Sequence, residues 1–485
     1  MFCNGVVTMQ SMGLGGGFLM TVYKRDEKKA YFLNAREKAP LNVKSEMYKG
    51  DPKTSQHGPL AVAVPGELRG YWTAYKRFGR LPWKELIEPT ITLCENGFNM
   101  TNHQHMSLFK NKLYDDPNFQ NGSRDADGKF KTRGSIIRPT RLCETLKVIA
   151  ENGGDELYND TLSKMLLEDI KAMGGIITQE DLDEYQTRTT CFQPRLQALG
   201  LLLAFILKIL DGYDFTRESI DDLNSTITTY HRMIEAFKYA YAKRTELGDV
   251  NFVNISELLA NLSSTEYADS IRMKIEDGFT SEDPKHYGAV FYSKEDHGTA
   301  HFSILDQAGD AVSVTSSVNI YFGAGFTSKQ TGVILNSVMD DFSFPYFKNY
   351  FGLPGSPNNE LKPGKRPLSS MSPTILTDRN GDVKLVVGAS GGTKITTSVA
   401  QVIMRTLWFG QNIKEAVDAP RLHHQLYPME VEYEYGNLKQ VVEGLKALGH
   451  KLIRNSGSVV CALLKMADKI IGNADYRKGG EVFGI

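Results

Sequence analysis

Two short segments carry the residues whose types and spacing are best suited to chemistry. Gly388-Ala389-Ser390-Gly391-Gly392 matches the Gly-x-Ser-x-Gly nucleophile elbow of serine hydrolases, which would make Ser390 a nucleophile. Gly298-Thr299 offers another nucleophile, because a threonine hydroxyl becomes reactive when a cut before the residue frees its own α-amino group as a base. Gly298 lacks a Cβ, so it lets that hydroxyl approach its carbonyl in an unusual backbone geometry.

The surroundings of Ser390 disagree with a serine hydrolase. The segment does lie between an expected strand, Val383 to Val387, and an expected helix, Thr393 to Trp408. A nucleophile elbow also needs a histidine late in the chain after an acid, and a long run of alternating strands and helices that the chain before Thr299 lacks. A glycine loop that only turns the chain is one alternative. Because the glycines precede a helix, their backbone N–H groups are also suited to holding an anion or an oxyanion.

The elements that must position these residues change character after His297. The earlier part is mostly helix over a little sheet, with one hairpin formed by Phe18 to Lys24 and Ala30 to Asn34. Helical spacing of apolar residues predicts the following helices: Pro65 to Phe78, Trp83 to Glu95, Thr140 to Ala150, Thr161 to Met173, Ala198 to Leu210, Thr226 to Lys243 and Thr265 to Glu276. The later part is rich in strands, and it contains two more predicted hairpins: Ala300 to Leu305 with Ala311 to Ser316, and Thr374 to Thr377 with Val383 to Val387.

Composition excludes several classes of protein. The 485 residues carry 56 Lys plus Arg against 57 Asp plus Glu, a net charge of -1, so no basic field exists to hold a nucleic acid. The most apolar run, Ala198 to Leu207, is about half of the roughly 20 residues that a membrane-spanning helix needs. The 5 cysteines form no Cys-x-x-Cys pair and no Cys/His cluster at zinc spacing, which predicts no metal site. A Cys94–Cys143 cross-link stays open at this point.

Glycosylation sequons are confined to the earlier part of the chain. The acceptor asparagines are Asn99, Asn121, Asn159, Asn224, Asn254 and Asn261. This distribution fits a secreted protein with one sugar-bearing segment and one bare segment.

Nine separated blocks together resemble the γ-glutamyltranspeptidase family in order and spacing, over nearly the whole chain. They are Gly13 to Gly17, Asn34 to Glu37, Gly298 to His301, Ser316 to Asn319, Met339 to Ser343, Arg366 to Met371, Gly388 to Gly392, Pro420 to His424 and Asp475 to Gly480. The resemblance implies an α+β fold, the αββα sandwich of N-terminal-nucleophile hydrolases, with two antiparallel sheets between helical layers. It also implies self-cleavage between Gly298 and Thr299 into a large segment, 1–298, and a small segment, 299–485, which form one intertwined heterodimer.

The same resemblance implies an activity and a role for each matching residue. Thr299 would attack the γ-amide of glutathione, form a γ-glutamyl ester and pass the acyl group to water, an amino acid or a dipeptide, with no cofactor and no nucleic acid partner. Five residues would bind the glutamyl zwitterion: Arg36, Ser369 and Ser370 its carboxylate, and Asn319 and Asp341 its ammonium group. Ser317 would assist Thr299, and the backbone N–H groups of Gly391 and Gly392 would stabilise the oxyanion.

Some positions depart from the family pattern. Val338 stands where the family usually has Glu or Gln, so we expect weaker γ-glutamyl binding with the chemistry retained. Ser317 replaces a Thr but keeps the hydroxyl. The segment Cys191 to Gln197 differs from the family, and Met1 corresponds to the middle of an early helix, after the family's membrane anchor. An uncleaved, catalytically silent family member with a binding or structural role is therefore the alternative function. The sequons support the family's usual extracellular setting, either secreted or at the outer face of the plasma membrane.

Overall fold

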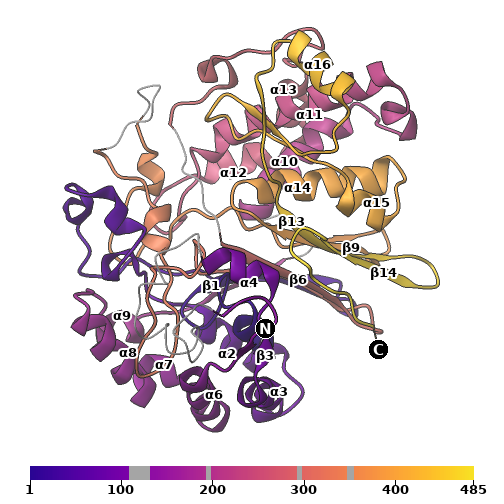
Figure 1. Cartoon of the computed structure of the whole chain (residues 1–485). Coiled ribbons are helices and arrows are strands. Elements are labelled where there is room, and N and C mark those ends of the chain that lie inside the picture. The colour runs from indigo at the N-terminus through magenta and orange to yellow at the C-terminus, as the bar shows by residue number, and fades with distance from the viewer. Residues whose placement is uncertain (109–130, 193–197, 292–297, 347–353, 485) are drawn as a thin grey trace.

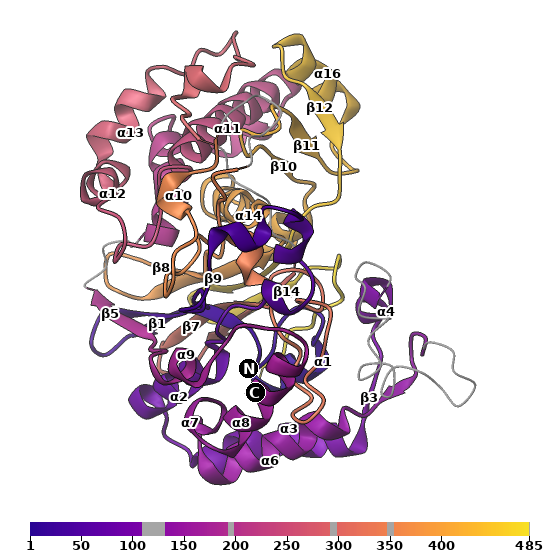
Figure 2. The same cartoon turned by 90° about the vertical axis from the view of Figure 1, so that its left-hand side faces the viewer.

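The computed structural model describes residues 1–484 apart from 109–130, 193–197, 292–297 and 347–353, and it places two sheets between two layers of helices (Figures 1 and 2). In the lower layer of Figure 1 lie α2 (Glu67–Phe78), α3 (Trp83–Asn96), α6 (Thr140–Asn152) and α8 (Thr161–Ala172). In the upper layer lie α10 (Ala198–Asp211), α11 (Leu223–Arg244) and α14 (Lys394–Ile403). The predicted α+β sandwich is confirmed.

The first sheet is antiparallel and joins strands from both sides of Gly298. Its order is β5 (Arg188–Phe192), β2 (Lys29–Ala35), β1 (Gly17–Lys24), β7 (Ala311–Ser317) and β6 (Thr299–Leu305). The register pairs Gly17 with Ser317 and Ser317 with Thr299. The N-terminal hairpin and the hairpin that follows Gly298 therefore belong to one continuous sheet.

The second sheet is also antiparallel, in the order β14 (Ile470–Ala474), β13 (Val459–Lys465), β9 (Val383–Ser390) and β8 (Thr374–Thr377). Two smaller sheets were not predicted. One contains β10 (Leu422–His423), β11 (Val431–Tyr433) and β12 (Leu452–Arg454), with β11 and β12 parallel, and the other pairs β3 (Phe98–Asn99) with β4 (Ile136–Ile137).

Each helical layer buries apolar side chains against one sheet. The lower core packs Leu68 of α2 and Ile87 of α3 against Phe18 and Leu33 of the first sheet. The upper core contains the apolar face of α10, α11 and α14 together with Leu385 and Val387 of β9. A smaller cluster, Tyr23, Ala311, Val383 and Val386, lies between the two sheets. These three cores account for the four layers.

The helices agree with the predicted ones in position, with differences at their ends. The expected helix Thr265 to Glu276 stops at Arg272 (α13, Thr265–Arg272), and the expected helix Thr393 to Trp408 is α-helical to Ile403 and continues as a π-helix, Met404–Trp408. The remaining short or peripheral helices are α1 (Phe2–Val7), α4 (Asn102–Leu108), α7 (Glu156–Asn159), α9 (Gln179–Asp183), α12 (Ser256–Ser263), α15 (Ile413–Asp418) and α16 (Lys439–Ala447). No helix in the described ranges is long and apolar enough to cross a membrane.

Cys94 in α3 and Cys143 in α6 form a disulfide, so the cross-link that the sequence left open is present. It closes a loop with a sequence separation of 49 residues, and this loop includes the undescribed residues 109–130. Cys3, Cys191 and Cys461 are free thiols.

Replacing both Cys94 and Cys143 with Ala should lower the free energy of unfolding by about 2–4 kcal/mol, because the cross-link restricts the unfolded chain. Denaturant titration of the double variant against the parent measures this difference. Cys461→Ala, which removes a free thiol, is the matched control. Equal stability of the double variant and the parent would show that the cross-link does not hold this layer together.

Candidate active site

Thr299 and Ser317 form a buried hydroxyl pair at the end of the β6–β7 hairpin. Thr299 begins β6, Ser317 ends β7, and the two residues are direct cross-strand partners. The Thr299 hydroxyl donates to Ser317 Oγ over 3.3 Å, and the Ser317 hydroxyl donates to the carbonyl oxygen of Gly298. One serine hydroxyl thus connects the predicted nucleophile with the peptide bond that precedes it.

Tight packing explains why residue 298 is glycine. A Cβ at Gly298 would lie 2.5 Å from the carbonyl oxygen of Asn319. Asn319 itself has φ +77, and its backbone N–H donates to Ser317 Oγ over 2.9 Å. Its side-chain Nδ2 donates to the carbonyl of Ser337 over 2.8 Å, whereas its buried Oδ1 has no hydrogen-bond partner among the described residues. The Oδ1 atom of Asn319 is therefore a buried hydrogen-bond acceptor that the described residues leave unused.

Lys478 is a site residue to which sequence reasoning gave no role. Its ammonium group donates to the carbonyl of Thr299 over 2.7 Å and to Ser11 Oγ over 3.2 Å. Burial lowers the pKa of Lys478 to about 8. The block Asp475 to Gly480 was part of the family resemblance, but only the folded chain shows that it places a cation on the backbone of Thr299.

Arg36 lies at the centre of a buried ion-pair cluster. It follows β2, it is 2% exposed, and its guanidinium pairs with Glu37 over 3.0 Å and with Asp341. Asp341 ends the short helix Val338–Asp341, which begins directly after Ser337, the residue whose carbonyl holds Asn319. The predicted carboxylate and ammonium binders are thus brought together, and this short helix connects them to the hydroxyl pair.

The serines Ser369 and Ser370 lie in the loop before β8, on the same side as Arg36. Arg36 and Ser369 both line a cavity of about 610 Å³, together with Asn34, Arg188 and Asp249. Ser370 Oγ accepts a hydrogen bond from Arg244 over 2.8 Å, which leaves the hydroxyl proton of Ser370 available for another acceptor.

Gly391 and Gly392 have φ values of +125 and +62 in the turn between β9 and α14. A Cβ on Gly391 would also lie 2.9 Å from the Cβ of Ser458. The turn carries the backbone N–H groups to the start of α14, as the strand-glycine-helix order predicts.

The serine-hydrolase interpretation of Ser390 gains no support from the nearby histidine. His301 packs on Gly388, but its ring nitrogens contact Thr315 Oγ1 at 2.8 Å and Ser303 Oγ at 3.1 Å. Burial lowers the pKa of His301 to about 3. The imidazole ring is therefore neutral, and both of its nitrogens contact hydroxyl groups of β6 and β7.

Val338 points into an apolar cluster with Tyr48, Met339, Phe342 and Phe344, and it is fully buried. It supplies no polar atom beside Asp341. The sequon asparagines Asn99, Asn159, Asn224 and Asn254 are exposed and Asn261 is half-buried, while Asn121 lies outside the described residues.

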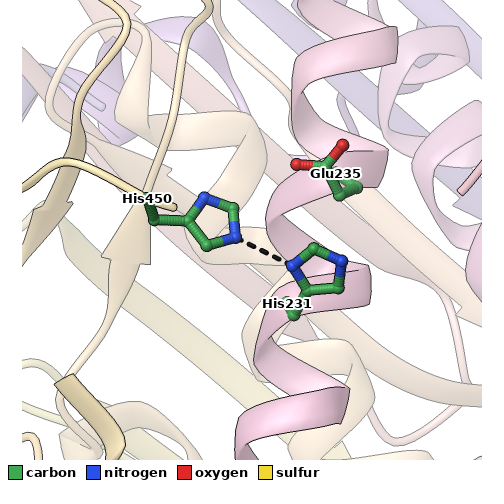
Figure 3. Close-up of side chains that lie close together, drawn as sticks. All are labelled: His231, Glu235 and His450. Carbon is green, nitrogen blue, oxygen red and sulfur yellow. Dashed lines mark hydrogen bonds between the residues drawn. The ribbon is translucent and has the colours of Figure 1, made fainter. Parts of the chain in front are cut away.

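His231, Glu235 and His450 form a second buried cluster, with donor atoms of the kind that bind metals (Figure 3). His231 Nδ1 lies 2.9 Å from His450 Nε2, and burial lowers the pKa of His450 to about 2. The Glu235 carboxylate, however, already accepts from Lys238 over 2.9 Å, Thr280 over 2.6 Å and Tyr287 over 2.9 Å. Lys238 thus supplies the cation that this carboxylate needs. Sequence spacing missed the cluster because it joins α11 to His450, which lies between α16 and β12, 219 residues after His231.

Replacing Arg36 with Leu should lower the free energy of unfolding by about 3–5 kcal/mol, because the buried carboxylates of Glu37 and Asp341 would lose the positive charge that pairs with them. Denaturant titration measures the loss. Arg25→Leu, which breaks a partly exposed pair with Asp382, is the control and should change stability little. Equal losses for the two variants would contradict the assignment of Arg36 to a buried charge cluster.

Comparisons with known proteins agree with this geometry. The family model described as gamma-glutamyltranspeptidase matches residues 1–485. Scoloptoxin SSD14 of Scolopendra dehaani is 44% identical over 100% of this chain and 87% of its own length. Glutathione hydrolase 2 of Arabidopsis thaliana is 36% identical, with 99% of this chain and 87% of the relative covered. The crystal structure of a cephalosporin acylase from Bacillus halodurans has the same fold, with a TM-score of 0.82 at 23% identity over 99% of this chain and 89% of its own. The chain belongs to the γ-glutamyltranspeptidase family of enzymes.

Proposed function

We propose that this chain is a self-cleaving proenzyme that transfers γ-glutamyl groups from glutathione and related compounds to water, amino acids or dipeptides. The observation that carries the proposal is the Ser317 hydroxyl, which contacts both the Thr299 hydroxyl and the Gly298 carbonyl. Family membership, with glutathione hydrolases of several organisms as relatives, supports the reaction class.

In the proposed cleavage, Thr299 Oγ attacks the Gly298 carbonyl carbon while Ser317 donates to the carbonyl oxygen. The hydroxyl proton passes to the amide nitrogen of Thr299, the C–N bond breaks, and an ester forms between Gly298 and Thr299. Water then hydrolyses the ester, which yields the Gly298 carboxylate and restores the Thr299 hydroxyl beside the amine that the C–N cleavage has freed. The products are the segments 1–298 and 299–485. They would stay together, because β1 pairs with β7 from Gly17 to Tyr23.

In the proposed transfer reaction, the Thr299 amine acts as the base for its own hydroxyl, which attacks the γ-carbonyl of the substrate. Cysteinylglycine leaves from glutathione, and the γ-glutamyl ester is then passed to water or to an acceptor amine. The N–H groups of Gly391 and Gly392 would stabilise the oxyanion of each tetrahedral intermediate, at about 3 kcal/mol per donor.

The charge cluster around Arg36 suits the glutamyl zwitterion. The substrate carboxylate would bind Arg36 with the hydroxyl protons of Ser369 and Ser370, and the substrate ammonium would bind Asp341 and the unused Asn319 Oδ1. The substrate would thereby replace the direct contact between Arg36 and Asp341. A site that binds both charges at once would favour a substrate with an α-amino acid end over a simple acid or a simple amine.

We also infer an extracellular setting, either secreted or at the outer face of the plasma membrane. The exposed sequon asparagines and the Cys94–Cys143 disulfide support it, because disulfides persist mainly in oxidising compartments. The alternative function is that of an uncleaved, silent family member with a binding or structural role. The departure from the family pattern at residues 191–197 favours it.

Intact mass and N-terminal sequencing of the chain from a secretory host should give two fragments after glycosidase treatment, the smaller one starting at Thr299. Thr299→Ala should remain a single chain and should lose γ-glutamyl transfer by several orders of magnitude, because it lacks the nucleophile. Ser390→Ala is the matched control and should cut and react like the parent. A single uncut parent chain would support the silent alternative, and loss of activity in Ser390→Ala alone would support a serine hydrolase.

Replacing Val338 with Glu should lower KM for a γ-glutamyl donor, with kcat changed little, because it adds a carboxylate next to the proposed ammonium site. The new carboxylate enters an apolar cluster, so a loss of stability should accompany the gain. Steady-state kinetics of the cleaved variant test this, with Val338→Leu as the apolar control. An unchanged KM would show that position 338 does not reach the donor.

A further inference from the structure

Glu67 is a fully buried acid that the proposed mechanism does not use. It lies in the first turn of α2, beneath the first sheet, and is 0% exposed. The Ser316 hydroxyl donates to both of its carboxyl oxygens, over 2.8 and 2.9 Å, and the Tyr71 hydroxyl donates to one of them. An acid in this position needs an explanation, because burial of a carboxyl group costs free energy.

The partners of Glu67 place it directly under the hydroxyl pair. Ser316 precedes Ser317, and its backbone pairs with Ala300, the residue after Thr299. The backbone N–H groups of Gly66 and Glu67 donate to the carbonyl of Gly16 over 2.9 and 3.0 Å. A Cβ at Gly16 would lie 2.3 Å from the carbonyl oxygen of Ser317. The first turn of α2 therefore holds the end of β7 from two sides.

Glu67 is a neutral acid in the folded protein at neutral pH. Burial raises the pKa of Glu67 to about 8, while hydrogen bonds from Tyr71 and Ser316 act in the opposite direction. A neutral carboxylic acid can accept from Tyr71 and donate to Ser316 Oγ. A glutamine side chain can do the same, since it offers a carbonyl oxygen and an amide N–H.

We propose that Glu67 is a positioning residue that anchors Ser316 through hydrogen bonds and so holds Ser317 against the Thr299 hydroxyl and the Gly298 carbonyl. The inference rests on the proposed function, because it assigns Glu67 a part in both self-cleavage and acyl transfer. Glu67 does not touch the reacting atoms. It acts through the strand that carries Ser317.

The test compares Glu67→Leu, Glu67→Gln and Ser316→Ala, with two measured quantities: the rate of conversion of the uncut chain into fragments, and kcat and KM of the cut enzyme. Glu67→Leu and Ser316→Ala should cut about 10- to 100-fold more slowly and show a similarly reduced kcat, because small misplacements of a reacting group have effects of this size. KM should change little, since Arg36, Asp341 and Asn319 are untouched. Glu67→Gln should restore both rates to near the parent values.

Two controls separate positioning from general loss of stability. Tyr71→Phe removes the other hydrogen bond to Glu67 and does not touch Ser316, so it should cut at the parent rate. The double variant Glu67→Leu/Ser316→Ala should be no slower than the slower single variant, because both changes break the same connection. If Glu67→Leu yields no folded protein, Ser316→Ala, which removes one hydroxyl, carries the test.

The pH dependence of stability provides a separate check on the neutral acid. The groups that interact electrostatically with Glu67 are Glu37, the Met1 amino group, Tyr71, Tyr158 and Tyr185. With its pKa raised from 4.5 to about 8, Glu67 binds a proton in the folded chain that the unfolded chain releases, so its contribution to stability falls as pH rises from 4.5 to 8. The melting temperature of Glu67→Gln relative to the parent should therefore be higher at pH 8 than at pH 5.

The outcomes are distinguishable. An uncut parent overturns the proposed function and this inference with it. A parent that cuts, with Ser316→Ala and folded Glu67→Leu cutting equally fast, overturns the inference alone. Loss of cutting in Glu67→Gln also overturns it, because a required carboxylate is incompatible with a neutral anchor.

Discussion

The register of the β6–β7 hairpin places Thr299 opposite Ser317, and the geometry of the site depends on that pairing. A shift of one residue would turn the Ser317 hydroxyl to the other face of the sheet, away from the Gly298 carbonyl. The register is fixed by more than the hairpin turn, because β7 also pairs with β1 from Gly17 to Tyr23. The N-terminal glycine loop therefore has a positional role: it lets β1 and the end of β7 approach closely enough for this pairing.

Two buried clusters pair opposite charges directly, and the buried acid Glu67 is held by hydroxyl groups instead. Arg36 lies between Glu37 and Asp341, and Lys238 pairs with Glu235. Burial raises the pKa of Glu37, and the positive charge of Arg36 opposes that rise. Burial also raises the pKa of Glu67, but there the main opposing effect comes from hydrogen bonds of Tyr71 and Ser316. The proposed binding of a zwitterion would gain from this arrangement, since the charges around Arg36 are held in place by one another.

Much of the fold could be predicted from the sequence, because the helices and hairpins have strong periodic signals and punctuating glycines. Thr140 to Ala150 and Ala300 to Leu305 are examples in which local spacing was sufficient. The peripheral sheet of β10 to β12 could not be predicted, since its strands are two or three residues long and one pairing is parallel. The residues of the candidate site were found through nine blocks taken together, because each block alone has an ordinary structural explanation.

What local spacing missed are contacts between distant segments. Lys478 reaches the Thr299 carbonyl across 179 residues, and Glu67 reaches Ser316 across 249. Lys478 contacts the backbone of Thr299, and Glu67 contacts the residue next to Ser317, so no local sequence pattern marks either contact. A chain cut after Gly298, as proposed, would keep these contacts. The hydrogen bonds to Thr299 come from β7 and from Lys478 in the C-terminal segment, and none of them requires the Gly298–Thr299 peptide bond to stay intact.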